Sequence, residues 1–307
     1  MLAFEDEKNR DQAMLIVGCG DVGRRIAHRA QGRGESVTAV VRSAESAQRL
    51  QADGVCASVI DLDRPPESPI GDDHEREIFY FAPPPSEGEK DPRIGNFLAA
   101  LRPGPEPRIV YISTTGVYGD CQGAWVDETS PAKPSVDRAK RRFDAEQQLL
   151  AWRTQGHGTV VLLRVAGIYG PGKLPLARLR KQLPMIAATD APWTNRIHID
   201  DLVAVCEAAM ERGRDGTVYN VSDGTPGNMR DYFDRVADLY GIPRAPAISV
   251  EEARRQLSPG MLSYLGESRR LDNRKMLTEL GVTLRYPDLD SGLRGVSKAL
   301  QEDDRNP

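Results

Sequence analysis

The chain has 307 residues, enough for one large domain with a smaller second lobe. Its net charge of -4 and its pI near 5.7 disfavour a nucleic-acid partner. It has no run of 18 apolar residues, no signal-like start and no cysteine spacing typical of metal ligands, so we expect a cytoplasmic protein with reduced thiols, no membrane partner and no metal site. Residues 1–12 lack apolar periodicity and are interpreted as a flexible tail.

The first predicted strand leads directly into a glycine-rich turn. Apolar residues 14–17 precede the turn, and a helix-like segment follows it at 24–33. In such a turn the first glycine makes the tight bend, the second lets the backbone approach a pyrophosphate and the third lets the helix pack on the strand. A purely structural turn is the alternative. The flanking strand and helix favour a dinucleotide site formed by Gly18, Cys19, Gly20, Asp21, Val22 and Gly23.

The second predicted strand, residues 36–41, ends at Arg42 and Ser43. An acidic residue about 20 positions beyond the glycines holds the ribose 2'-hydroxyl of NAD, whereas an arginine accommodates the 2'-phosphate of NADP. Arg42 lies 19 residues after Gly23, and neither of its neighbours is acidic. We therefore expect NADP as the cofactor, with NAD and a solvated surface arginine as the alternative.

Further strands alternate with helices along the first half of the chain. We predict strands at 55–60, 78–81, 108–112 and 159–164, and helices at 44–50 and 88–101. This alternation predicts an α/β fold with a Rossmann-type doubly wound parallel sheet. Ligands of such sheets bind at the carboxyl ends of the strands. The candidate cofactor contacts there are Asp61, for which an ordinary surface acid is the alternative, and Leu62, Ala82, Pro83, Ser113 and Val165.

Five segments together carry a resemblance to a known family. Residues 113–119 read Ser-Thr-Thr-Gly-Val-Tyr-Gly, and the other matching segments are 165–172, 196–202, 217–221 and 270–281. With them the chain resembles the extended branch of the short-chain dehydrogenase/reductase superfamily, the NAD-dependent epimerase/dehydratase family. The resemblance implies an NAD(P)-binding oxidoreductase or epimerase/dehydratase-like enzyme, and a homodimer as a possible assembly.

The resemblance also implies how the chain is divided. We expect an NAD(P)-binding Rossmann domain at 13–170 and a smaller C-terminal substrate lobe at 171–300. Within the lobe, about 197–222 returns to the Rossmann domain, with a helix at 201–211 and a strand at 218–221. A helix is predicted at 228–240, and residues 301–307 are interpreted as a second flexible tail.

The family's catalytic hydroxyl is implied at Thr114, four residues before Tyr118. Its role would be to hydrogen-bond the reacting oxygen, and a threonine that only ends the strand is the alternative. The family's Tyr-x-x-x-Lys pair is absent. Counting back from Lys140 places Val136 at the tyrosine position, and counting from Glu146 places arginine at both positions, 138 and 142.

An apolar stripe that begins at Val136 indicates that this residue packs in the core, which favours the register with arginines. In that register Arg142 takes the lysine position and is a candidate cofactor contact. Arginine does not donate a proton at neutral pH, so another group must do so. The candidates are Tyr118, Lys140 and a water molecule.

Cations outnumber acids between residues 172 and 199, which favours an anionic ligand. The candidate substrate contacts are Arg178 and Arg196, although a solvated helix face explains Arg178 equally well. His198 and Asp201 are interpreted as structural residues. The sequence thus predicts an NADP(H)-binding oxidoreductase or epimerase/dehydratase-like enzyme acting on a small, anionic or sugar-type substrate. The alternative is a non-catalytic NADP(H)-binding sensor or regulatory protein.

Overall fold

The computed structural model describes residues 13–71, 75–102 and 106–303. The tail predicted at 1–12 lies outside these residues. The second predicted tail lies partly within them, because the last helix, α12 (Leu289–Asp303), continues past residue 301. None of the described helices combines the length and the apolarity that a bilayer-spanning helix requires.

The chain divides into two compact units. The first unit contains the chain up to Val117, with Asp137–Arg164 and Val203–Tyr219. The second unit contains Tyr118–Val136, Val165–Leu202 and the chain from Asn220 onward. Segments 118–136 and 165–170 therefore group with the second unit, although the sequence assigned them to the Rossmann domain. Of the segment expected to return to that domain, 203–219 groups with the first unit.

A seven-stranded sheet confirms the predicted Rossmann-type fold. Its strands follow the order β12-β7-β5-β4-β1-β2-β3, with parallel pairing on both sides of β1. Each predicted strand of this sheet is present within a few residues of its expected bounds. The strands are β1 (Ala13–Val17), β2 (Ser36–Val41), β3 (Cys56–Val59), β4 (Glu75–Tyr80), β5 (Arg108–Thr114), β7 (Thr159–Val165) and β12 (Thr217–Val221).

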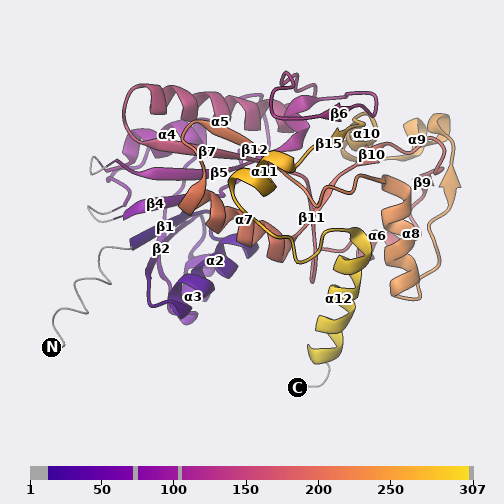
Figure 1. The fold of residues 1–307 in the computed structure, drawn as a ribbon, viewed down its shortest axis with the longest axis horizontal. Coiled ribbons are helices and arrows are strands. Elements are labelled where there is room, and N and C mark those ends of the chain that lie inside the picture. The colour runs from indigo at the N-terminus through magenta and orange to yellow at the C-terminus, as the bar shows by residue number, and fades with distance from the viewer. Residues whose placement is uncertain (1–12, 72–74, 103–105, 304–307) are drawn as a thin grey trace. The chain divides into compact units, whose positions relative to one another are not determined.

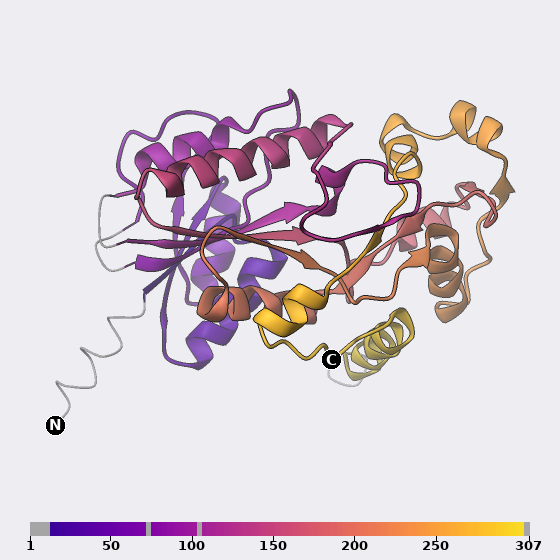
Figure 2. The ribbon, with the colours of Figure 1, turned by 45° about the horizontal axis from the view of Figure 1, so that its top comes forward.

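Helices cover both faces of the sheet, as Figures 1 and 2 show. On one face lie α4 (Pro92–Ala100) and α5 (Asp137–Thr154). On the other lie α2 (Asp21–Gly32), α3 (Ala44–Ala52) and α7 (Ile199–Arg212). Alternate strand residues explain the two-sided core, because successive side chains of a strand point to opposite faces. Those that face α4 and α5 include Leu15, Val17, Ile78, Tyr80, Ile109 and Tyr111.

The helix predicted at 88–101 begins only at Pro92, because Asp91 caps it. The Asp91 carboxylate accepts a hydrogen bond from the main-chain N–H of Arg93 at 3.0 Å. Proline at the first helical position needs no N–H partner and is already set to the helical φ angle. The segment before it therefore remains outside the helix.

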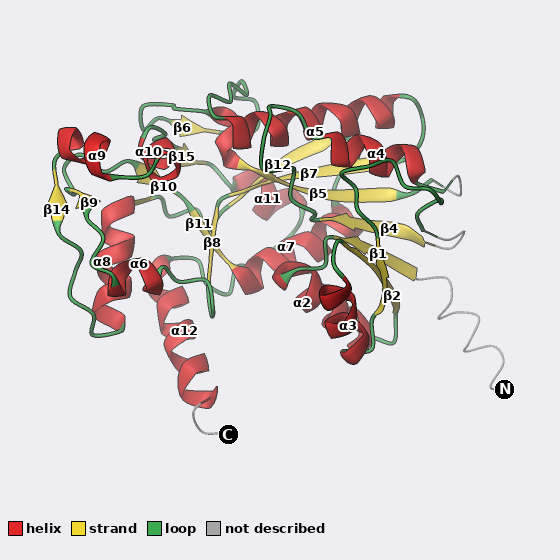
Figure 3. Cartoon of the chain, turned by 180° about the vertical axis from the view of Figure 1, so that it is seen from behind, coloured by secondary structure: helices red, strands yellow, loops and turns green. Residues whose placement is uncertain are grey.

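The second unit is built from short strand pairs and helices, visible from behind in Figure 3. Its paired strands are β6 (Trp125–Val126) with β15 (Arg270–Leu271), β8 (Gly167–Tyr169) with β11 (Arg196–His198), β9 (Met185–Ile186) with β14 (Ala247–Ile248), and β10 (Trp193–Thr194) with β13 (Gly227–Asn228). Its helices include α6 (Leu176–Arg180), α8 (Met229–Leu239), α9 (Val250–Gln256), α10 (Pro259–Leu265), α11 (Arg274–Glu279) and α12. Its core contains Tyr169, Leu179, Met185, Phe233, Val236 and Leu293.

Candidate functional site

The glycine turn between β1 and α2 has the geometry that its sequence predicts. Gly18 has a φ of 84°, a conformation that favours glycine, and its N–H donates to the carbonyl oxygen of Val40 at 2.8 Å. Gly20 caps α2, and its carbonyl oxygen accepts from Arg24 N–H at 2.8 Å. A side chain at Gly20 would meet no heavy atom within 4 Å. The space needed for a phosphate group is thus open next to the first N–H groups of the helix.

The third glycine and the cysteine of the turn pack together. A Cβ atom on Gly23 would lie 3.0 Å from Ile16 Cγ2 and 3.2 Å from Cys19 Sγ, so only a glycine lets the helix approach the strand this closely. Cys19 is 6% exposed, and burial raises the pKa of its thiol to about 12. The thiol therefore stays protonated at neutral pH, which fits a packing residue.

Arg42 lies exposed at the carboxyl end of β2, with no carboxylate within 4 Å among the described residues. Asp63, an acid near enough to feel its charge, is bound through both oxygens by Arg93, at 2.6 and 2.8 Å. These hydrogen bonds from Arg93 hold the pKa of Asp63 below its usual range. Because Arg93 already neutralises this carboxylate, the Arg42 guanidinium remains available to an anionic ligand.

The other cofactor candidates of this edge differ in how accessible they are. Ser43 caps α3, accepting from Ser46 N–H at 3.2 Å, and Asp61 is exposed. Leu62 and Ala82 are buried at 6% and 9%, so their contribution to a ligand site rests on the main chain. The carbonyl oxygen of Pro83 accepts from Arg93 at 2.8 Å.

Arg142 of α5 reaches the ends of two neighbouring strands. Its Nη1 donates to the carbonyl oxygen of Ile112 at 3.0 Å and to the Tyr111 hydroxyl at 3.2 Å, with a longer contact of 3.4 Å to the carbonyl oxygen of Ala82. No carboxylate lies within 4 Å of this guanidinium among the described residues. Arg142 therefore brings a positive charge to the carboxyl ends of β4 and β5, where the lysine register places a cofactor contact.

The expectation that Val136 packs in the core is wrong. Val136 is half-buried and lies just before the first residue of α5, Asp137. The buried stripe of the helix begins at Ala139 and continues with Ala145 and Leu149. The register with arginine at 138 and 142 is supported by the position of Arg142 instead.

Ser113 belongs to a buried network that sequence reasoning missed. Its hydroxyl donates to Glu146 at 2.5 Å, and Arg164 binds the same carboxylate at 2.8 and 3.2 Å. All three side chains are less than 10% exposed. The available signal was the Glu146 position of the family pattern, but its partners lie 33 and 18 residues away. The Ser113 hydroxyl thus helps to join β5, α5 and β7.

The catalytic candidates lie in different surroundings. Thr114, the last residue of β5, is half-buried, and its hydroxyl oxygen accepts from Gly116 N–H at 3.2 Å. The Tyr118 hydroxyl, 2% exposed, donates to the Asn220 side chain at 2.8 Å. Lys140 pairs with Glu89 at 2.5 Å, and this contact raises the pKa of its ammonium group. The roles of Thr114, Tyr118 and Lys140 remain predictions.

In the second unit the two candidate substrate arginines lie in different places. Arg178 donates to the carbonyl oxygen of Pro184 at 2.6 Å, a contact within its own loop. Arg196 lines a pocket of about 210 Å³ that does not include Arg178. This pocket also contains Asp223 and Tyr232, which sequence reasoning did not single out. The available signal for Asp223 was its position just after strand β12.

The remaining second-unit candidates are Val165 and the pair interpreted as structural. Val165 ends β7 and is 4% exposed. The Asp201 carboxylate accepts from the main-chain N–H groups of Arg285 and Tyr286, at 2.8 and 2.9 Å. The His198 ring, 1% exposed, lies 4.0 Å from the Tyr286 ring between centroids. These contacts agree with the structural role predicted for His198 and Asp201.

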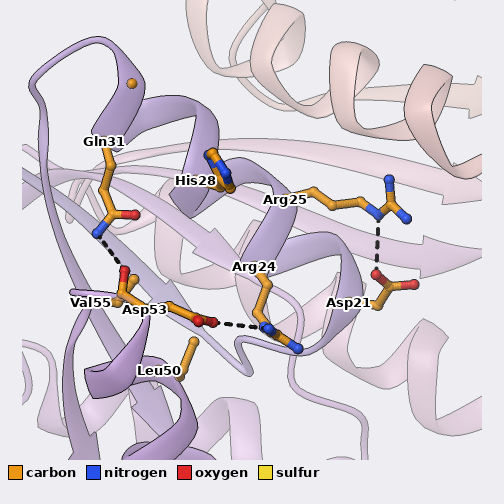
Figure 4. A pocket seen from close by; sticks show the side chains of 9 residues that line it. Asp21, Arg24, Arg25, His28, Gln31, Leu50, Asp53 and Val55 are labelled. Carbon is orange, nitrogen blue, oxygen red and sulfur yellow. Dashed lines mark hydrogen bonds and ion pairs between the residues drawn. The ribbon is translucent and has the colours of Figure 1, made fainter. Parts of the chain in front are cut away.

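A larger hollow of about 680 Å³ lies along α2 and the end of α3, as Figure 4 shows. Arg24 pairs there with Asp53 at 2.9 Å and Arg25 with Asp21 at 3.1 Å, all partly exposed. Exposed pairs of this kind contribute little stability. Of the glycine turn, only Asp21 lines this hollow, so it is distinct from the space above Gly20.

Comparisons with known proteins agree with this geometry. Protein YeeZ of Escherichia coli is 27% identical over 187 residues, which cover 59% of this chain and 60% of that relative. A 4-hydroxy-2-methyl-3-oxo-4-farnesyl-3,4-dihydroquinoline-1-oxide ketoreductase of Stigmatella aurantiaca is 28% identical over 243 residues, 73% of this chain and 72% of the relative. The chain thus spans about 60% of the length of the first of these relatives.

Solved structures match nearly the whole chain. A conserved protein of unknown function from Silicibacter pomeroyi is 30% identical, with a TM-score of 0.79 over 94% of this chain and 99% of that one. A dTDP-glucose 4,6-dehydratase from Bacillus anthracis, solved in complex with NAD, is 15% identical and shares the fold, with a TM-score of 0.71 over 96% and 98%. The model of the NAD dependent epimerase/dehydratase family matches residues 96–222. The chain therefore belongs to the NAD-dependent epimerase/dehydratase family.

Proposed function

We propose that the protein is an NADP(H)-dependent oxidoreductase or epimerase-type enzyme acting on a small molecule. The observation that carries this proposal is the turn between β1 and α2, which leaves open space above Gly20 beside the N–H groups of a helix start. The Bacillus anthracis dehydratase of the same fold holds NAD, and the Stigmatella aurantiaca relative is a ketoreductase. Both support a redox role for this chain.

The preference for NADP rests on Arg42. Its guanidinium has no acidic partner within 4 Å among the described residues, and the nearby Asp63 is occupied by Arg93. A 2'-phosphate would therefore gain a charge-assisted hydrogen bond without first displacing an ion pair. Arg142 would offer its charge at the ends of β4 and β5, close to where the family's lysine contacts the cofactor.

In the reaction that we propose, the bound cofactor supplies or accepts a hydride. The Thr114 hydroxyl orients the carbonyl or alcohol oxygen of the substrate by a hydrogen bond. Arg142 stabilises negative charge but does not transfer a proton, because its pKa stays above about 12. The proton is transferred by Tyr118, Lys140 or a water molecule.

The missing phenol favours the second candidate, a protein that binds NADP(H) without turnover and reports its level to a partner. Calorimetry with NADPH and NADH tests cofactor binding, which both candidates require. A screen of NADPH oxidation against carbonyl compounds, including sugar nucleotides, then separates them. Turnover with any compound supports the enzyme. Tight NADPH binding with no turnover across the screen supports the sensor, and the absence of binding contradicts both.

A further inference from the structure

The pocket of the second unit has a polar lining that the proposed reaction does not use. It lies among β11, the segment after β12, α8 and the start of α12, and its volume is about 210 Å³. A site of this size suits one small ring rather than a nucleotide, since sites for drug-sized ligands begin at about 300 Å³. The polar groups that decide its chemistry belong to Arg196, Asp223, Asp231, Arg235, Asp288 and Asp290.

Arg196 is held in a flat slot. Its guanidinium carbon lies 3.6 Å from the centroid of the Tyr232 ring, and its Nη2 donates to Thr194 Oγ1 at 3.2 Å. A Cβ atom on Gly167 would lie 3.2 Å from its Nη1, so the glycine leaves room for the guanidinium. Among the described residues no carboxylate lies within 4 Å of its nitrogens. A guanidinium has five N–H donors, and several of these remain for a ligand.

Asp223 provides an acceptor in the same pocket. It is 5% exposed, and one oxygen accepts from Thr225 N–H at 3.0 Å. The main-chain N–H of Asp223 donates to the carbonyl oxygen of Arg196 at 2.7 Å, which ties the two residues together. Their side chains make no ion pair with each other. The pocket therefore presents a cationic donor and a carboxylate acceptor that do not satisfy one another.

The other charges around the pocket disfavour a charged ligand. Asp231 and Asp290 both pair with Arg235, and Asp288 accepts from Ser291 N–H at 2.7 Å. Four carboxylates against two guanidiniums would repel an anion. A cation would be repelled by Arg196. A neutral group that both accepts and donates hydrogen bonds fits this lining best, and hydroxyl groups do both.

We propose that this pocket binds a neutral polyhydroxylated ring, with Arg196 donating to its hydroxyl oxygens and Asp223 accepting from its hydroxyl groups. The site goes beyond the proposed redox function because its ligand needs no nicotinamide cofactor. The sequence favoured an anionic ligand for Arg196 from the cations around it, and the pocket surrounds this arginine with acids instead.

Binding is tested on the full chain without cofactor, by NMR saturation transfer and titration with myo-inositol and D-glucose. Acetate and inorganic phosphate are the anionic probes. We expect at least one polyol to bind, and we expect Arg196→Gln and Asp223→Asn each to weaken it by at least about fivefold, because each removes a charge-assisted hydrogen bond. The exposed residues Arg254 and Asp190 provide matched controls, Arg254→Gln and Asp190→Asn, which should bind like the wild type.

The pH dependence gives a second test that does not depend on variants. Asp223 accepts from a hydroxyl group only when ionised, so polyol binding should strengthen between pH 6 and 8, and this change should vanish in Asp223→Asn. The neighbours that set its charge are Arg196 and Asp288. Acetate or phosphate binding more tightly than both polyols, and more so at low pH, would overturn the proposal. Absence of binding by either polyol, or equal binding in both pocket variants, would also overturn it.

The hydroxyl groups can belong to the substrate or to a separate regulatory ligand. Once NADPH turnover is found, competition of the bound polyol against the substrate identifies the first source, and a non-competitive effect identifies the second. The binding titration stands in either case. If no turnover exists, the redox proposal fails while the polyol result still decides this one.

Discussion

Gly18 packs directly against the main chain of Ala82. A Cβ atom on Gly18 would lie 2.5 Å from the Cα atom of Ala82, and Gly18 has a φ of 84°. Gly20, two residues later in the same turn, faces open space. The two glycines are therefore required for different reasons: Gly18 for folding and Gly20 for the ligand.

We expect Gly18→Ala to lower the free energy of unfolding by about 2 to 5 kcal/mol, since it combines an unfavourable φ with a clash against backbone. Thermal and urea unfolding without cofactor measure this. A variant as stable as the wild type would contradict the close packing of β1 against the segment after β4.

Gly20→Val should abolish NADPH binding and change the free energy of unfolding by no more than about 1 kcal/mol. Its φ of -81° is accessible to valine, and the added methyl groups would occupy the space for the pyrophosphate. The measurement is the rise in melting temperature on adding NADPH. Gly32→Val, on the same helix and also facing open space, is the matched control and should keep this rise. Retention of the rise in Gly20→Val would place the phosphates elsewhere.

Arg42→Asp should reduce or reverse the preference for NADPH over NADH. A charge-assisted contact with the 2'-phosphate contributes roughly 1.5 to 3 kcal/mol, so the wild-type preference should exceed about tenfold. Calorimetry with both cofactors measures it. Arg49→Asp, an exposed position on the following helix, serves as the control for a general change in charge. Equal affinities of the wild type for the two cofactors would show that Arg42 does not read the phosphate.

Thr114→Ala should lower any NADPH-dependent turnover by at least about tenfold, as the loss of an oxygen-orienting donor does. Thr114→Ser keeps the hydroxyl and should retain most of the activity. The NADPH affinities of both variants, measured in parallel, show whether the loss concerns turnover or cofactor binding. Full activity in Thr114→Ala would remove this residue from the active site.

Asp223 should make the protein less stable as the pH rises. Burial raises its pKa from 3.8 to about 7, so between these values the folded state binds more protons than the unfolded state, and the free energy of unfolding falls. The effect is absent below pH 4 and complete above pH 7. The two pKa values set an upper bound of about 4 kcal/mol.

Urea unfolding of the wild type and of Asp223→Asn from pH 4 to pH 8 measures this contribution. The difference between the two proteins isolates Asp223 from carboxylates whose pKa is lowered by folding, such as Asp63 and Asp272. We expect Asp223→Asn to gain stability relative to the wild type as the pH rises. Parallel pH profiles of the two proteins would contradict the raised pKa.

The sequence by itself determined the sheet and the glycine turn. Alternating apolar strands and helices follow from local periodicity, and Gly18-x-Gly20-x-x-Gly23 follows from the backbone conformations that only glycine adopts easily. Both signals lie within short stretches of chain. The order of the strands then follows from the handedness of parallel crossovers. For these reasons the fold was predictable without coordinates.

Only the tertiary structure decided which side chains meet. The Glu146 carboxylate joins Ser113 to Arg164, and the Arg196 side chain stacks on a tyrosine 36 residues away, at Tyr232. Local periodicity predicted Val136 in the core, but the preceding loop ends there and the helix begins one residue later. Burial and pairing depend on segments that are distant in the chain, so the charge state of Asp223 and the shape of its pocket emerge only when those segments pack together.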